Sequence, residues 1–76
     1  MSLVKKRSVT IRGQRTSFSL EGPFLRELEM IAKTRGMKLA ELVVQIDENR
    51  PRNANLSSAL RLYVLYWLKE RGSRTG

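Results

Sequence analysis

The segment 56–71 constrains the fold more than any other part of this chain, because it reads as a helix with almost no polar face in its middle. A helix that is apolar all round must be covered on all sides, and one copy of a 76-residue chain offers little to cover it with. We expect a second copy, or the rest of the chain, to bury it; exposure as a docking site for a further protein partner is the alternative. The apolar residues concerned are Leu60, Leu62, Tyr63, Val64, Leu65, Tyr66, Trp67 and Leu68.

The chain contains no cysteine and no histidine, which removes two ways of stabilising a small domain. Disulfides are impossible, and metal sites built from thiolate or imidazole ligands are excluded. A domain of this size buries only about 60% of the surface of its unfolded chain, so its core is marginal. A partner chain is the remaining route, and the sequence therefore predicts a homodimer without metal or cofactor.

The same absences argue against an enzyme, because the usual general bases and thiol nucleophiles are missing. The one tight pair of carboxylates, Asp47-Glu48, consists of adjacent residues that would not face each other on a helix. No segment approaches the roughly 20 apolar residues of a membrane span, and the residues after Lys5-Lys6-Arg7 are too polar for a signal peptide. We expect a cytoplasmic, nucleoid-associated protein without membrane contact.

Positive charge is concentrated at the N-terminal end of the chain. The net charge is +8, and residues 1–20 contain five cationic side chains and no acidic one. A basic block of this kind is typical of proteins that bind polyanions, so it predicts a nucleic acid as a partner; a solvated basic tail is the alternative. Residues 1–7 are expected to form a flexible arm. The cations of the block predicted to contact phosphates are Lys5, Lys6, Arg7 and Arg12.

Alternation of apolar and polar residues predicts strand structure within residues 8–20, in two runs over 8–12 and 15–20. Gly13-Gln14 between the runs suits a two-residue type II′ turn. The first run could instead remain free, as an arm that follows phosphates or enters a minor groove. The pairs expected from the turn are Val9 with Phe18 and Ile11 with Thr16.

Three amphipathic or apolar segments after the strands predict helices, so the fold class is mainly α with a short N-terminal β element. Pro23 fits the first turn of the first helix, and Gly36 fits the residue after its end. Arg50-Pro51 ends the second helix, and Asn55 or Ser57 caps the third. The predicted helices cover 22–35, 38–49 and 56–71, in one domain over 8–71 that is followed by a loose tail over 72–76.

The run over 15–20 predicts a polar face that points away from the helices. If Phe18 and Leu20 point inward, then Arg15, Ser17 and Ser19 point outward. Arginine can bind O6 and N7 of guanine with two hydrogen bonds, and serine is a short donor and acceptor, so these three residues are predicted to contact base edges. An ordinary solvent-facing strand is the alternative. One chain would supply one strand of a ribbon that enters the major groove, and its partner the other.

The start of the second helix predicts a phosphate site. Free backbone amides and the helix dipole attract anions at a helix N-terminus, and here the amides near Lys38 and Leu39 lie beside the Lys38 ammonium group. Phosphate contacts of this kind fix the orientation of a protein on DNA and carry no sequence information.

The segments Arg15-Thr-Ser-Phe-Ser-Leu-Glu21, Arg35-Gly36-Met37 and Asn55-Leu-Ser-Ser-Ala-Leu-Arg61 together resemble the ribbon-helix-helix superfamily, in a branch known from short bacterial proteins. The resemblance covers roughly residues 8–68. It implies an intertwined homodimer, transcriptional regulation by DNA binding through the ribbon, and phosphate anchoring at the start of the second helix. Glu21 lies near the reading face, where a carboxylate repels phosphates unless it accepts a hydrogen bond from a cytosine amine.

Two copies are expected to share one core and to meet edge to edge along Thr16–Leu20. If both strand runs pair, the dimer would have a four-stranded sheet, too broad to enter a major groove as a simple ribbon. Such a sheet would lie against the DNA backbone, bind RNA or meet a protein instead. The residues predicted for the dimer core are Phe18, Leu20, Leu28, Leu42, Ile46, Leu60, Val64 and Trp67.

Overall fold

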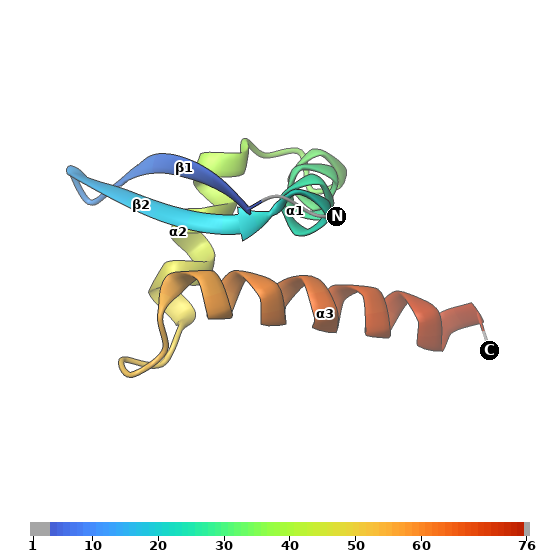
Figure 1. Cartoon of the computed structure of the whole chain (residues 1–76). Helices are drawn as coiled ribbons and strands as arrows, with labels where there is room; N and C mark the ends of the chain where they lie inside the picture. The colour runs from blue at the N-terminus through green and yellow to red at the C-terminus, as the bar shows by residue number, and fades with distance from the viewer. Residues whose placement is uncertain (1–3, 76) are drawn as a thin grey trace.

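A computed structural model of the chain describes residues 4–75, with side chains described as far as residue 71, and Figure 1 shows a hairpin of two strands followed by three helices. This order confirms the predicted fold class of a mainly α protein with a short N-terminal β element. No helix among the described residues is long and apolar enough to cross a membrane. The elements are β1 (Val4–Ile11), β2 (Gln14–Glu21), α1 (Gly22–Thr34), α2 (Leu39–Asn49) and α3 (Leu56–Thr75).

β1 and β2 form an antiparallel hairpin within one chain. β1 begins at Val4, so residues 4–7 are strand and not the flexible arm that the sequence predicted, because they pair with the end of β2. Residues 1–3 of that predicted arm lie outside the described residues. The run over 8–12 also pairs, apart from Arg12 in the turn. The chain therefore supplies two paired strands itself, which is the alternative that the sequence left open beside a ribbon shared with a partner.

The hairpin turns at Arg12 and Gly13 and not at Gly13-Gln14. The φ angles of these two residues are 53° and 77°, and positive φ at both central residues defines a type I′ turn. The predicted register is therefore wrong by two positions. A shift of two leaves every side chain on the same face of the sheet, so alternation alone cannot detect it. The pairs next to the turn are Ile11 with Gln14 and Val9 with Thr16.

The hydrophobic core lies between the inward face of the hairpin and the three helices. Each large aliphatic side chain that is fully buried there contributes roughly 1.5–3 kcal/mol of transfer free energy. Seven of the eight side chains predicted for a dimer core belong to this core of a single chain, and Trp67 packs against it while partly buried. They are therefore covered within a single chain, and their place at an interface between two copies stays a prediction. The core consists of Ile11, Phe18, Leu20, Leu25, Leu28, Ile31, Ala32, Leu42, Val43, Ile46, Leu56, Leu60 and Val64.

α1 ends in a Schellman motif centred on Gly36. Gly36 has a φ of +71°, and its amide donates to the carbonyl of Lys33 at 3.1 Å. The amide of Met37 donates to the carbonyl of Ala32 at 2.9 Å, which completes the motif. Gly36 thus acts as the sequence predicted, and the ends of α1 and α2 lie within one residue of the predicted positions.

A clamp formed by Arg50 organises the link between α2 and α3. Its guanidinium donates to the carboxylate of Asp47 at 2.7 Å and to the backbone carbonyl of Ala54. Asn55 then caps α3, because its Oδ1 accepts from the amide of Ser58 at 2.8 Å. The first of the two predicted caps is therefore confirmed.

α3 is longer than the sequence predicted. It continues to Thr75 instead of ending at residue 71, so residues 72–75 are helical and only residue 76 of the predicted tail lies outside the described residues. A single internal glycine such as Gly72 costs a helix about 1 kcal/mol relative to alanine, which does not suffice to end it.

Replacing Arg12 by asparagine should stabilise the fold, because asparagine tolerates positive φ and Asn-Gly is the preferred type I′ pair. We expect the free energy of unfolding in urea to rise by about 0.5–1 kcal/mol. Arg12→Lys is the matched control, since it keeps both the charge and the unfavourable backbone conformation, and it should leave stability unchanged. Equal stability of Arg12→Asn and Arg12→Lys would contradict the assigned turn.

Candidate nucleic-acid interface

Polar and basic side chains line the face of the hairpin that points away from the helices. Residues opposite each other in an antiparallel pair share a face, so the register places Thr10 with Arg15, Ser8 with Ser17 and Lys6 with Ser19. We call these six residues the outward face. The hydroxyl oxygens of Ser8 and Ser17 lie 3.5 Å apart. The three residues predicted to contact bases, Arg15, Ser17 and Ser19, therefore lie on one face of the hairpin.

Arg15 is the side chain of the outward face with the greatest capacity for recognition. It is exposed, and it makes no hydrogen bond or ion pair with any side chain that the structure describes. Its fork of N–H donors is thus available for the two acceptors of guanine or for a phosphate. Ser17 beside it is exposed, whereas Ser19 is partly buried.

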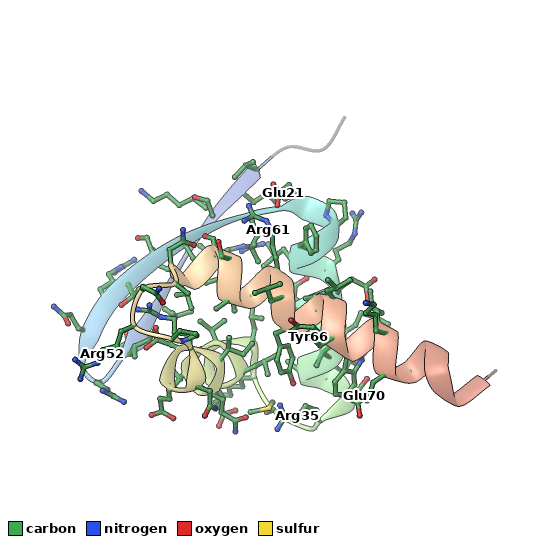
Figure 2. The ribbon with its side chains drawn as sticks, turned by 90° about the horizontal axis from the view of Figure 1, so that it is seen from below. Glu21, Arg35, Arg52, Arg61, Tyr66 and Glu70 are labelled. Carbon is green, nitrogen blue, oxygen red and sulfur yellow. The ribbon has the colours of Figure 1, made fainter. Side chains whose placement is uncertain are left out.

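Glu21, the acidic residue at the end of β2, is held by Arg61 of α3. Arg61 Nε lies 3.0 Å from Oε1 of Glu21, and Nη2 lies 3.2 Å from Oε2, which is a bidentate ion pair. Figure 2 shows the two side chains where the end of β2 meets α3. The Arg61 hydrogen bonds, helped by a backbone hydrogen bond, hold the pKa of Glu21 below its ordinary value of 4.5. The charge that would repel phosphates is therefore compensated within the chain.

The outer edge of β2 is partly occupied by α3. A two-residue loop makes the amides of Arg15, Ser17 and Ser19 point away from β1. The amide of Ser19 donates to Oγ of Ser57 at 3.3 Å. Pairing with a second copy along the whole of Thr16–Leu20 would need this amide. The outer edge of β2 is therefore open near the start of the strand and closed near Ser19.

The cations of β1 do not gather on one surface. Lys6 lies on the outward face, whereas Lys5 and Arg7 stand opposite Leu20 and Phe18 and so belong to the other face, where both remain exposed. Strand alternation separates them, which a prediction of a free arm could not foresee. The structure thus brings Lys6 together with Arg15 and leaves the other two apart from it.

Arg12 at the tip of the hairpin lies near the end of α2. Its Nη2 is 3.9 Å from Oε2 of Glu48, and both side chains are largely exposed. Pairs of this kind contribute between about 0 and 1 kcal/mol, so the Arg12 guanidinium remains available to a stronger anion. Arg52, in the loop after α2, is a further exposed cation that the sequence analysis did not single out (Figure 2).

The start of α2, which the sequence predicted to anchor a phosphate, already has an acidic neighbour. Oε1 of Glu41 accepts from the amide of Lys38 at 2.8 Å, which caps the helix from within its first turn. The free backbone amides of α2 begin at Leu39. The Lys38 side chain is exposed, and its ammonium group cannot accept hydrogen bonds from these amides. A phosphate at this position would have to share the helix end with the Glu41 carboxylate.

A hydrogen-bond network ties the loop between α1 and α2 to α3. The guanidinium of Arg35 donates to Oη of Tyr63 at 2.8 Å and to Oε1 of Gln45 at 3.2 Å. One side chain at the end of α1 thereby joins α2 and α3.

Among the described residues, no group of three or more His, Cys, Asp or Glu side chains could hold a metal ion.

A protein-family model described as a ribbon-helix-helix domain matches residues 4–68 of the chain. The match includes both strands, α1, α2 and the part of α3 that packs on the core. Comparisons with curated proteins and with solved structures give no match.

The Glu21–Arg61 ion pair should make stability depend on acid pH. Because the pKa of Glu21 is lowered in the folded state, its contribution is fully present above pH 4.5 and is lost as the pH falls through the folded-state value. Urea unfolding at a series of pH values should therefore show a smaller acid-induced loss for Glu21→Gln than for the unmodified protein. Glu29→Gln, an exposed change on α1, should keep the original dependence. An unchanged pH profile in Glu21→Gln would refute the coupling.

Proposed function

Since the chain belongs to the ribbon-helix-helix family, we propose that it is a transcription regulator that binds duplex DNA through the outward face of its hairpin. Members of this family are generally DNA-binding regulators and typically have no enzymatic activity. We further propose that it works as a homodimer in the cytoplasm, in association with the nucleoid.

The observation that carries the proposal is the outward face itself. It presents four hydroxyl groups, the Lys6 ammonium and Arg15, which has no partner among the side chains that the structure describes, while Arg61 compensates the carboxylate of Glu21. Two antiparallel strands are narrow enough to enter a major groove about 12 Å wide. Because one chain supplies both strands, its ribbon needs no second copy before it can enter the groove.

The roles follow from position on this surface. Arg15 and Ser17 would contact base edges, and Ser19 would do so from its partly buried place at the end of the ribbon. Lys6, near the start of β1, and Arg12, in the turn after it, would contact phosphates and fix the ribbon in the groove. Lys38 and Leu39, together with Lys5 and Arg7, remain proposed phosphate contacts away from this face.

Binding of a fluorescent DNA duplex should weaken steeply with salt, because each neutralised phosphate releases counterions. Fluorescence anisotropy should show log K falling with log[salt] by about 0.9 for each phosphate contact. Absence of binding to duplex DNA at low salt would refute the proposed function. Tighter binding to an RNA of the same sequence would favour the alternative of an RNA-binding sheet.

Arg15→Ala should relax sequence preference more than it lowers overall affinity. A bidentate arginine–guanine contact discriminates against a wrong base by about 1–3 kcal/mol, and that discrimination should vanish at one base position. Selection from a randomised duplex library before and after the change measures it. Arg26→Ala removes an equal charge from an exposed position of α1 and should leave preference intact. A uniform loss across all sequences in Arg15→Ala would show a phosphate contact instead.

A further inference from the structure

The row of side chains that forms the outward face continues one pair beyond Lys6 and Ser19. The next residues on the same side of the sheet are two positions further along each strand, and the register pairs them as Val4 with Glu21. Val4 is 59% exposed, and among the described residues it is the one large hydrophobic side chain of the hairpin with such exposure. An apolar group therefore lies at the other end of the face from Arg15.

Val4 is the member of this pair whose side chain is left for contact with a ligand. The carboxylate of Glu21 is engaged by its bidentate ion pair with Arg61. Valine favours strands, but packing in the core does not account for Val4, because strand alternation places it on the side away from the core residue Ile11. Its side chain has no donor or acceptor, so the contacts that it offers to a ligand are apolar.

The edges of the base pairs carry one apolar group in the major groove, which is the C5 methyl group of thymine. We propose that Val4 is a specificity-determining residue that packs against the methyl group of a thymine while Arg15 binds a guanine in the same groove. This inference rests on the proposed function and adds to it a second base and the strand that reads it. It gives β1 a part in base recognition, whereas the base contacts proposed above all come from β2.

The length of β1 sets the distance between the two bases. Thr10, which stands opposite Arg15, is six residues from Val4 on the same strand, which corresponds to about 20 Å. Base pairs follow one another at about 3.4 Å along the axis of the duplex, and the groove runs obliquely to that axis, so each base pair takes up somewhat more of the length of the ribbon. A ribbon that lies along the groove therefore places the guanine and the thymine about four to six base pairs apart.

The side chains between the two ends make the outward face chemically asymmetric. Ser8 and Ser17 in its middle are short donors and acceptors that accommodate either kind of base pair. Lys6, next to Val4 on the same face, would hold a phosphate and so fix this end of the ribbon. Hydrogen bonding and charge thus dominate near Arg15 and apolar contact near Val4, so the face should read a sequence that differs at its two ends.

Replacing thymine by deoxyuridine in the duplex tests the inference, because it removes the methyl group and leaves the hydrogen-bonding groups unchanged. The duplex is the one that the unmodified protein selects, and its guanine position is the one that Arg15→Ala relaxes. At one thymine four to six base pairs from that guanine, deoxyuridine should raise the dissociation constant about threefold to fivefold, the effect of one buried methyl group. Fluorescence anisotropy measures both duplexes.

Val4→Ala should bring the ratio of the two dissociation constants close to one at that position and leave the guanine preference intact. Met30→Ala is the matched control, because it shortens an apolar side chain that is 63% exposed on α1, and it should keep the ratio of the unmodified protein. If Val4→Ala fails to fold by circular dichroism, Val4→Thr keeps the β-branched shape, replaces one methyl group by a hydroxyl group and should also lower the ratio.

Three outcomes would overturn the inference while the guanine preference persists: a selected duplex without thymine at this distance, equal binding of thymine and deoxyuridine duplexes, or an unchanged ratio in the Val4 variants. Failure to bind any duplex would refute the proposed function itself. The two failures are therefore distinguishable.

Discussion

The packing of the hairpin against the first turns of α3 is the contact on which the rest of the structure depends. Leu20 of β2 and Leu60 of α3 are completely buried in the same core. The amide of Ser19 and the carboxylate of Glu21 attach the end of β2 to Ser57 and Arg61 on the neighbouring turns of α3. Together with α1 and α2, which also pack against the strands, α3 covers the inward face of the ribbon. One short chain can therefore close this core without a disulfide or a metal.

This arrangement separates two kinds of surface. The residues of α3 that pack against the ribbon are buried within the chain, whereas the polar side of the ribbon remains largely exposed. The large hydrophobic side chains of α3 that stay exposed among the described residues form the second kind of surface: Leu62, Leu65, Tyr66 and Leu68.

Much of the fold could be predicted because local signals determine it. Period-two alternation marked the strands, and Gly36 and Asn55 marked a helix end and a helix start. The turn was misplaced because a shift of two residues preserves the faces of the sheet and Gly13 serves either turn. For the same reason Arg15, Ser17 and Ser19 were assigned to the correct face. The Glu21–Arg61 pair could not be foreseen, since it joins residues 40 positions apart through tertiary packing.

The distribution of acidic groups explains how a chain with seven carboxylates can present a basic surface. Around the hairpin and α2 these groups are engaged by the chain's own donors. Glu21 binds Arg61, Asp47 binds Arg50, Glu48 lies near Arg12, and Glu41 accepts from a backbone amide. The other three, Glu27, Glu29 and Glu70, lie on α1 and on the C-terminal half of α3. Internal pairing near the ribbon thus leaves Arg15 and Lys6 to set the electrostatic potential of the outward face.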